Sequence, residues 1–318
     1  MTQEQVRITR LDPLKFAAAA LTVLAAPVLF VLEQAVAGFA LLLAGLAVAW
    51  WYERRATRRL EAVGAGAAGA GSGAGDAGSA SGLRDPSPAQ RTPSLLRDLS
   101  LVAMGLAIVR TINLEAQLDN WSMLRFTLAL GGAVAVPYLV SRFLYRDRAI
   151  GFPWRHDHDG RPNPRWGRLH WTWLLAVLLL GWLILPWYFI SSGVYLNWPV
   201  VDTPDLIARL FVGVGAVGIW DELFFICTVF TVLLRHFPVW AANMLQATVF
   251  VSFLWELGYR AWGPLLTIPF ALVQGFIFLR TRSLSYVVTV HLLFDAVVFA
   301  VLVHAHDPSL FNIFPTAP

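Results

Sequence analysis

The sequence predicts an all-α, polytopic transmembrane helical bundle of about nine spans, with eight spans also compatible. Of its 318 residues, 57% are hydrophobic and only 14% are charged, and the mean hydropathy is +0.61. A soluble domain needs more charge to cover its surface. Apolar stretches of roughly 17 to 25 residues recur along the chain, and each can cross about 30 Å of hydrocarbon as a helix. Open sheet edges are excluded because lipid cannot hydrogen-bond to them.

Nine apolar runs follow one another along the chain. The first follows Lys15 and other basic residues, as in a secretory signal peptide, but it is longer than such a signal and a second run begins at once. A transmembrane hairpin is therefore the favoured interpretation. The third run is short and contains Arg110, so it decides between eight and nine spans. The runs lie at 16–33, 36–52, 99–114, 122–144, 169–194, 207–234, 238–258, 263–280 and 284–304.

Composition divides the chain into five parts. Residues 64–82 are nearly all Gly, Ala and Ser, a composition that cannot bury enough apolar surface to become ordered. The predicted parts are a transmembrane hairpin (1–55), a flexible linker (56–95), middle helices with a basic cytoplasmic loop (96–168), an intramembrane core (169–305) and a tail (306–318).

The charges alternate from one connection to the next. Arginines follow spans two, four, six and eight, whereas the other connections carry mainly acids, with Arg260 as the main exception. Under the positive-inside rule, this pattern predicts a multi-pass protein of the plasma membrane with a cytoplasmic amino terminus and an outer carboxyl terminus. The pI of about 9.6 therefore reports orientation, and no nucleic-acid partner is predicted. The expected partners are the lipid bilayer and a membrane-associated peptide or protein. Cys227 is the only cysteine, which excludes an intramolecular disulfide and a multi-cysteine metal site.

Five ionisable side chains inside the last spans are the candidate site: Asp221, Glu222, Glu256, His291 and Asp295. A charged group at the bilayer centre costs roughly 2.5–3.5 kcal/mol, so such residues are functional candidates. His291 and Asp295 are four residues apart and share a helix face. Asp221 and Glu222 are adjacent and diverge by about 100°, so they cannot both point at one atom without help.

A structural interpretation stays open beside the functional one. A His–Asp pair can simply tie two helices together, and Glu256 can lie near the outer interface, where a charge costs little. At about 1.5 Å per residue, His291 lies about 12 Å and Glu256 about 27 Å from the cytoplasmic ends of their helices. Glu256 therefore reaches the site only if a helix is broken or a loop dips inward, which Gly258 and Pro264 allow.

Two short motifs resemble those of the CPBP family, the CAAX prenyl protease type of intramembrane metalloprotease. The segment from Asp221 to Ile226 is similar to the family's EExxxR motif, and the segment from His291 to Asp295 matches its HxxxN/D motif. The family places an FxxxH motif about 34 residues after the acidic pair, and Glu256 occupies the place of that histidine. The resemblance covers about residues 170–305. Asp221, Ile226 and Glu256 depart from the motifs, and the usual arginine is missing.

The resemblance implies an integral membrane endopeptidase that hydrolyses a peptide bond with an activated water at the cytoplasmic side of the bilayer. It makes Asp221 the base, Glu222 its acidic partner, and His291 and Asp295 metal ligands or oxyanion stabilisers. Glu222, Glu256, His291 and Asp295 would be the ligands of a divalent metal, zinc before Mn²⁺ or another hard ion. The alternatives are a catalytically lapsed member that binds or scaffolds a membrane partner and a proton-coupled transporter, although no inverted repeat is evident.

Overall fold

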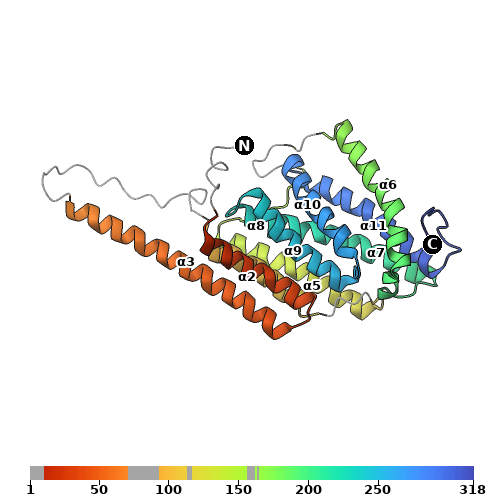
Figure 1. Ribbon diagram of the computed structural model, residues 1–318, viewed down its shortest axis with the longest axis horizontal. Coiled ribbons are helices and arrows are strands. Elements are labelled where there is room, and N and C mark those ends of the chain that lie inside the picture. Colours follow the sequence, from red (N-terminus) through yellow and green to blue (C-terminus); the bar gives the residue numbers. More distant parts are fainter. Residues whose placement is uncertain (1–10, 71–92, 113–116, 156–161, 163–164) are drawn as a thin grey trace.

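The computed structural model describes residues 11–70, 93–112, 117–155, 162 and 165–318, and in these ranges it forms helices and no strand. Figure 1 shows a bundle of helices with one long helix projecting from it. Within the described residues, seven helices are long and apolar enough to cross a membrane: Pro13–Phe30, Ala35–Arg59, Asn120–Tyr145, Arg168–Ser191, Pro204–Leu234, Gly263–Thr281 and Leu284–His306. The predicted fold class is therefore confirmed.

Each of the nine predicted apolar runs coincides with helical structure. In chain order the elements are α2 (Pro13–Phe30), α3 (Ala35–Ala70), α4 (Leu95–Val109), α5 (Asn120–Leu139), the π-helix η2 (Val140–Tyr145), α6 (Arg168–Ser191), the 3₁₀-helix η3 (Val194–Asn197), α7 (Pro204–Asp221), the π-helix η4 (Glu222–Phe230), α8 (Thr231–Leu234), α9 (Val239–Leu257), α10 (Gly263–Thr281) and α11 (Leu284–His306).

Two of the helices that coincide with the nine runs, α4 and α9, are not among these seven, because one is too short and the other too polar. Helix α4 has 15 residues and is therefore only about 22 Å long. Helix α9 carries Asn243, Gln246 and Glu256, which lower its hydropathy. Arg110, the residue that made the third run uncertain, is the C-cap of α4 and so does not lie within the helix.

Polar side chains fix where several of the helices begin. The side chains of Asp12, Ser94, Asp119, Thr203 and Ser283 each accept a hydrogen bond from a backbone N–H in the first turn of the helix that follows. These residues satisfy donors that have no partner within the helix. The helix starts are therefore encoded locally.

Helix α3 continues beyond the predicted start of the linker. The segment was expected to lose order from residue 56, but the helix runs to Ala70 and projects well past the bundle. Its sequence after Trp51 is rich in Arg, Ala, Glu and Leu, which favour helix strongly. Residues 71–92 of the predicted linker lie outside the described residues, and Leu95, its last predicted residue, begins α4. The domain boundaries therefore stay a prediction.

The outer surface of the bundle is apolar. Large hydrophobic side chains are exposed on several helices, among them Leu128, Leu175, Leu179, Phe211 and Phe276. A soluble protein does not expose so many, whereas a lipid-facing surface requires them. The chain is accordingly a multi-pass membrane protein.

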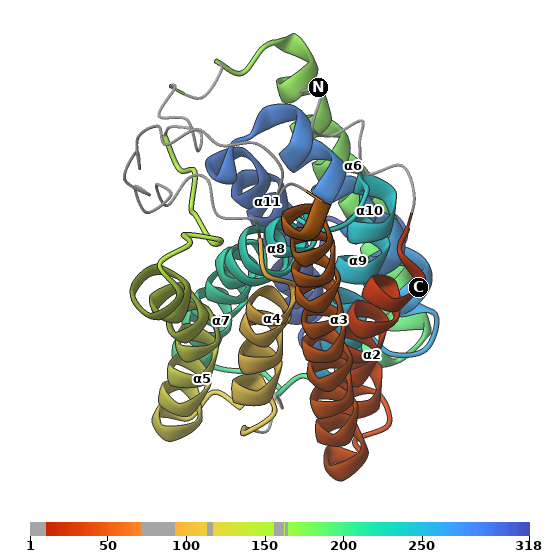
Figure 2. The ribbon, with the colours of Figure 1, turned by 90° about the vertical axis from the view of Figure 1, so that its left-hand side faces the viewer.

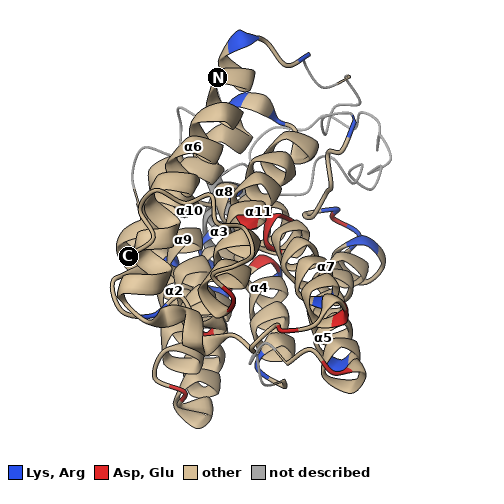
Figure 3. Ribbon diagram, turned by 90° about the vertical axis from the view of Figure 1, so that its right-hand side faces the viewer, with Lys and Arg blue, Asp and Glu red and all other residues tan. Residues whose placement is uncertain are grey.

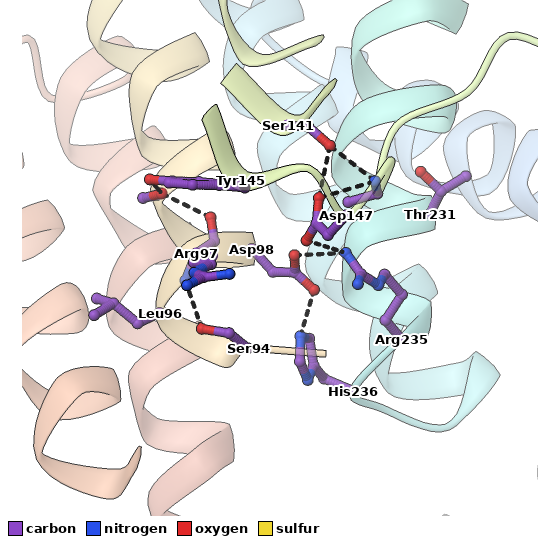
Figure 4. A network of polar contacts seen from close by, with 12 residues as sticks. Ser94, Leu96, Arg97, Asp98, Ser141, Tyr145, Asp147, Thr231, Arg235 and His236 are labelled. Atoms are coloured by element: carbon purple, nitrogen blue, oxygen red, sulfur yellow. Dashed lines mark hydrogen bonds and ion pairs between the residues drawn. The ribbon is translucent and has the colours of Figure 1, made fainter. Parts of the chain in front are cut away.

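Polar contacts join the helix connections at each end of the bundle. At one end, which we call the basic end, Arg235 after α8 contacts Asp98 of α4 (2.7 Å) and Asp147 after η2 (3.2 Å). His236 Nε2 lies 2.6 Å from the other oxygen of Asp98. Figure 4 shows this network, which ties the first turn of α4 to the connections after η2 and α8. Burial lowers the pKa of His236.

The opposite end, which we call the acidic end, is joined by a different set of contacts. Arg209 of α7 donates to Asn120 Oδ1 at the start of α5, and Asn197 of η3 donates to the carbonyl of Gly258 after α9. Figure 2 shows α2, α3, α4 and α5 running side by side between the two ends. The alternation of basic and acidic connections in the sequence therefore corresponds to two ends of one bundle.

Candidate functional site

The acidic pair lies where an α-helix changes into a π-helix. Asp221 is the last residue of α7 and Glu222 the first of η4. π-helical turns are rare and are frequent at functional sites, because they redirect side chains that regular helix geometry would separate. The hydroxyl of Thr228 donates to the carbonyl of Leu223, five residues earlier (3.0 Å), and so satisfies one carbonyl of the widened turn.

Aromatic packing holds this segment in place. The Trp220 ring stacks on Phe224 at 5.1 Å, and its Nε1 donates to the carbonyl of Leu130 on α5. Gly105 of α4 makes room for Phe224, because a Cβ at residue 105 would lie only 2.2 Å from that ring. The position of the acids is thus set by α4 and α5 as well as by their own helix.

His291 of α11 lies between the carboxylates and contacts them through both ring nitrogens. Its Nδ1 is 2.8 Å from Glu222 Oε1, and its Nε2 is 3.4 Å from Asp221 Oδ2 and 3.9 Å from Asp295 Oδ1. All four side chains are at most 10% exposed. Although the side chains of Asp221 and Glu222 diverge, both contact the imidazole ring of His291, because each approaches a different ring nitrogen. Acidic residues, red in Figure 3, lie beside α11 in the middle of the bundle.

Gln274 of α10 is a member of the site that sequence reasoning missed. Its Nε2 donates to Glu222 Oε1 (2.7 Å) and to the carbonyl of Val287 (3.2 Å). The signal that could have found it is a lone amide within the apolar run 263–280. Ile226, which replaces the arginine of the resembled motif, is buried in the apolar core. Among the described residues, the ion pairs of Asp221, Glu222 and Asp295 go to His291 only.

Small and aromatic residues shape the surroundings of His291. The Phe270 ring meets the imidazole edge-on at 5.1 Å, and Phe250 of α9 does so at 6.2 Å. Gly218 of α7 allows Asp295 to come close, because a Cβ there would lie 1.9 Å from Asp295 Oδ2. Only glycine is compatible with this approach of α7 and α11.

Glu256, the fifth predicted site residue, lies elsewhere. Its carboxylate pairs with Arg110 at 3.5 Å, near the acidic end of the bundle. The helix α9 is unbroken up to Leu257, so Glu256 stays about 9 Å further along it than Phe250, which contacts His291. The structure thus brings together Asp221, Glu222, His291 and Asp295 but not Glu256, as the depth of a straight helix requires.

A cavity of about 390 Å³ ends at three of these residues, namely Asp221, His291 and Asp295. Both side-chain oxygens of Asp221 and Oδ2 of Asp295 are buried and have no hydrogen-bond partner among the described residues. Glu222 does not line the cavity. Its Oε1 contacts Nδ1 of His291, whereas Nε2 of the same ring faces Asp221 and Asp295, which do line it. The site thus presents unpartnered acceptors to a mainly apolar space, which is costly unless a donor such as water or a ligand occupies it.

The side chains of the site do not form a ready metal centre. Within the described part of the chain, no group of three or more His, Cys, Asp and Glu residues comes together in an arrangement that could hold a metal ion. The donor types suit zinc, but His291 Nδ1 is occupied by Glu222 and Glu256 is absent from the site.

Comparison with known proteins identifies the same part of the chain. Residues 203–297 match the family model described as Type II CAAX prenyl endopeptidase Rce1-like. Comparison with curated proteins and with solved structures gave no match. The matched residues run from the start of α7 into α11 and contain Asp221, Glu222, His291 and Asp295 together with Gln274. Residues 203–297 are therefore similar to an Rce1-like type II CAAX prenyl endopeptidase domain, which is consistent with the resemblance to the CPBP family.

Proposed function

We propose that the protein is an integral membrane endopeptidase of the CAAX-protease type that hydrolyses a peptide bond with an activated water. One observation carries the proposal: His291 holds Glu222 on one nitrogen and faces Asp221 and Asp295 with the other, at the inner end of a cavity. Water activation needs a base, a hydrogen-bond donor and an acid that orients the donor. Here Asp221 is the base, the imidazole of His291 is the donor and Glu222 is the orienting acid.

The cavity-lining groups take the chemical roles. A water beside Asp221 gives its proton to that carboxylate and attacks the carbonyl carbon of the scissile bond. An imidazolium ring donates from both nitrogens, and the flanking carboxylates stabilise its charge. His291 Nε2 then donates to the developing oxyanion. When the tetrahedral intermediate collapses, the proton on Asp221 passes to the leaving amine, so that water is added across the bond.

Glu222 and Gln274 act through His291. Glu222 Oε1 accepts from His291 Nδ1 and from the Gln274 amide, so two donors fix the carboxylate and the carboxylate fixes the ring. This corresponds to the acid that orients a catalytic histidine in hydrolase triads. Glu222 is accordingly a positioning residue, and Gln274 supplies a neutral donor to the acidic pair, which lacks the arginine of the resembled motif.

The role of a metal is open to a direct test. Because Glu256 lies away from the other predicted ligands and Glu222 occupies His291 Nδ1, we expect turnover to survive dialysis of the purified protein against a chelator, and metal analysis to find less than one zinc per chain. Stoichiometric zinc that is lost in His291→Ala, together with inactivation by the chelator, would support the predicted metal site.

We further propose that the basic end of the bundle faces the cytoplasm in the plasma membrane, with the carboxyl terminus outside. In a Cys227→Ala background, Arg148→Cys should react with an impermeant maleimide only from the cytoplasmic side and Asn312→Cys only from outside. Arg148 and Asn312 are both exposed, and they follow helices that end at opposite ends of the bundle. The reverse labelling pattern would invert the proposed orientation.

The function itself is tested by turnover of a membrane-tethered reporter peptide by the purified chain in liposomes. Cleavage that depends on Asp221 and His291 supports the endopeptidase. A well-folded protein that binds the reporter without cleaving it would instead be the lapsed, scaffolding relative.

A further inference from the structure

Along the length of the bundle, the cavity extends from the site in one direction only. From Asp221, His291 and Asp295 it runs towards the acidic end, where Gln117, Ser122 and Trp198 line it. None of the described residues of the basic-end network in Figure 4 lines it. The site is thus closed towards the basic end and open towards the acidic end.

The cavity also opens sideways between α5 and α7. Seven residues line it and are at the same time exposed on the outer surface of the bundle. Gln117 and Arg125 lie nearer the acidic end, and the other five lie along α5 and α7: Thr127, Gly131, Val212, Ala216 and Ile219. Gly131 of α5 and Gly213 of α7 border empty space, since a Cβ at either would meet nothing within 4 Å. We call this opening the α5–α7 portal. Because the surface around it is apolar, the portal faces lipid.

The inner end of the cavity selects for hydrogen-bond donors. The unpartnered oxygens of Asp221 and Asp295 need N–H or O–H groups. A hydrocarbon tail has none, and a peptide within an α-helix has already used its backbone N–H groups. An extended peptide offers one N–H per residue.

On the basis of the proposed function, we infer that the substrate is a membrane-embedded protein whose transmembrane helix ends in an extended peptide segment. This segment reaches Asp221 and His291 from lipid through the α5–α7 portal, and the chain beyond the site lies towards the acidic end. The recognised chemistry is extended backbone with apolar side chains, and binding through the portal precedes cleavage.

Photocrosslinking tests this inference independently of cleavage. The full chain and a synthetic peptide are reconstituted together in phosphatidylcholine liposomes. The peptide has a transmembrane segment of about 20 Leu and Ala residues followed by a short Gly-Ser-Val extension. Benzoylphenylalanine replaces Val212 at the portal or, as the matched control, Leu175 of α6, which is also exposed to lipid. Peptide and lipid adducts are quantified by mass spectrometry, and peptide cleavage is measured in the same liposomes.

We expect at least about tenfold more peptide adduct from position 212 than from position 175, as for a site about 1.4 kcal/mol more favourable than bulk contact. Gly131→Leu, or Gly213→Leu if the first variant misfolds, should fill the portal and abolish the excess. Ala135→Leu, exposed one turn along α5 but outside the cavity lining, should not.

Equal peptide adducts from both positions, or lipid adducts alone at position 212, would overturn the inference; the second result would make the cavity a lipid site. The peptide adduct without cleavage by the unsubstituted chain would refute the proposed endopeptidase while the binding route stands. Cleavage without an excess adduct at position 212 would refute the route while the endopeptidase stands.

Discussion

Asp221→Asn and His291→Ala should each reduce turnover of the reporter by at least about 10²–10⁴-fold, the usual contribution of a positioned acid or base. Asp221 lines the cavity with both oxygens unpartnered, and His291 is the donor that faces it. The asparagine variant keeps the shape of the side chain and removes its charge, so folding should suffer little or improve.

The double variant should be hardly slower than either single one, because residues that act as a unit are strongly non-additive. Glu222→Gln should also be severely impaired. The neutral amide does not stabilise the positive charge of the imidazolium ring as the carboxylate does, so the form of His291 that donates from both nitrogens is less populated.

Initial rates and thermal unfolding in detergent should be measured on the same preparations. Asp205→Asn, an exposed acid at the acidic end, is the matched control and should change neither quantity. Glu256→Gln distinguishes the placement of Glu256 in the structure from its predicted role, since a carboxylate paired with Arg110 should not be needed for turnover. Unchanged turnover with lower stability in Asp221→Asn and His291→Ala would remove the protease and leave a structural pair.

Asp98→Ala should destabilise the protein by about 3–5 kcal/mol, the cost of breaking a buried ion pair from one side. Asp98 is fully buried and pairs with Arg235 through one oxygen and with His236 through the other. Removing the Asp98 carboxylate deprives Arg235 and His236 of their acceptor on α4. Asp147 stays beside Arg235 and limits the loss.

The apparent melting temperature in detergent measures this effect, and Asp205→Ala is the comparison. Asp205 makes a surface pair with Arg209 one helical turn away and is 72% exposed, so its loss should cost at most about 0.5 kcal/mol. Equal melting temperatures for the two variants would show that the basic-end network contributes no more than a surface pair.

The sequence by itself determined the class of the protein and where its helices lie. A segment that crosses lipid must satisfy its own backbone groups, so apolar runs such as 169–194 and 284–304 became α6 and α11 without knowledge of their neighbours. The i, i+4 spacing likewise placed His291 and Asp295 on one face. The cost of buried charge identified Asp221 and Glu222, because that cost depends on residue type and span and hardly on packing.

Membership of the site depended on tertiary structure. Whether Glu256 or Gln274 reaches the site depends on the depth and rotation of α9 and α10, which their contacts with other helices set. The 34-residue spacing placed Glu256 in the site, but an unbroken α9 carries it to Arg110. Helix packing likewise produces the π-helix after Asp221, the closed basic end and the α5–α7 portal. Secondary structure in lipid is a local requirement, whereas a site between helices is a property of how several of them pack.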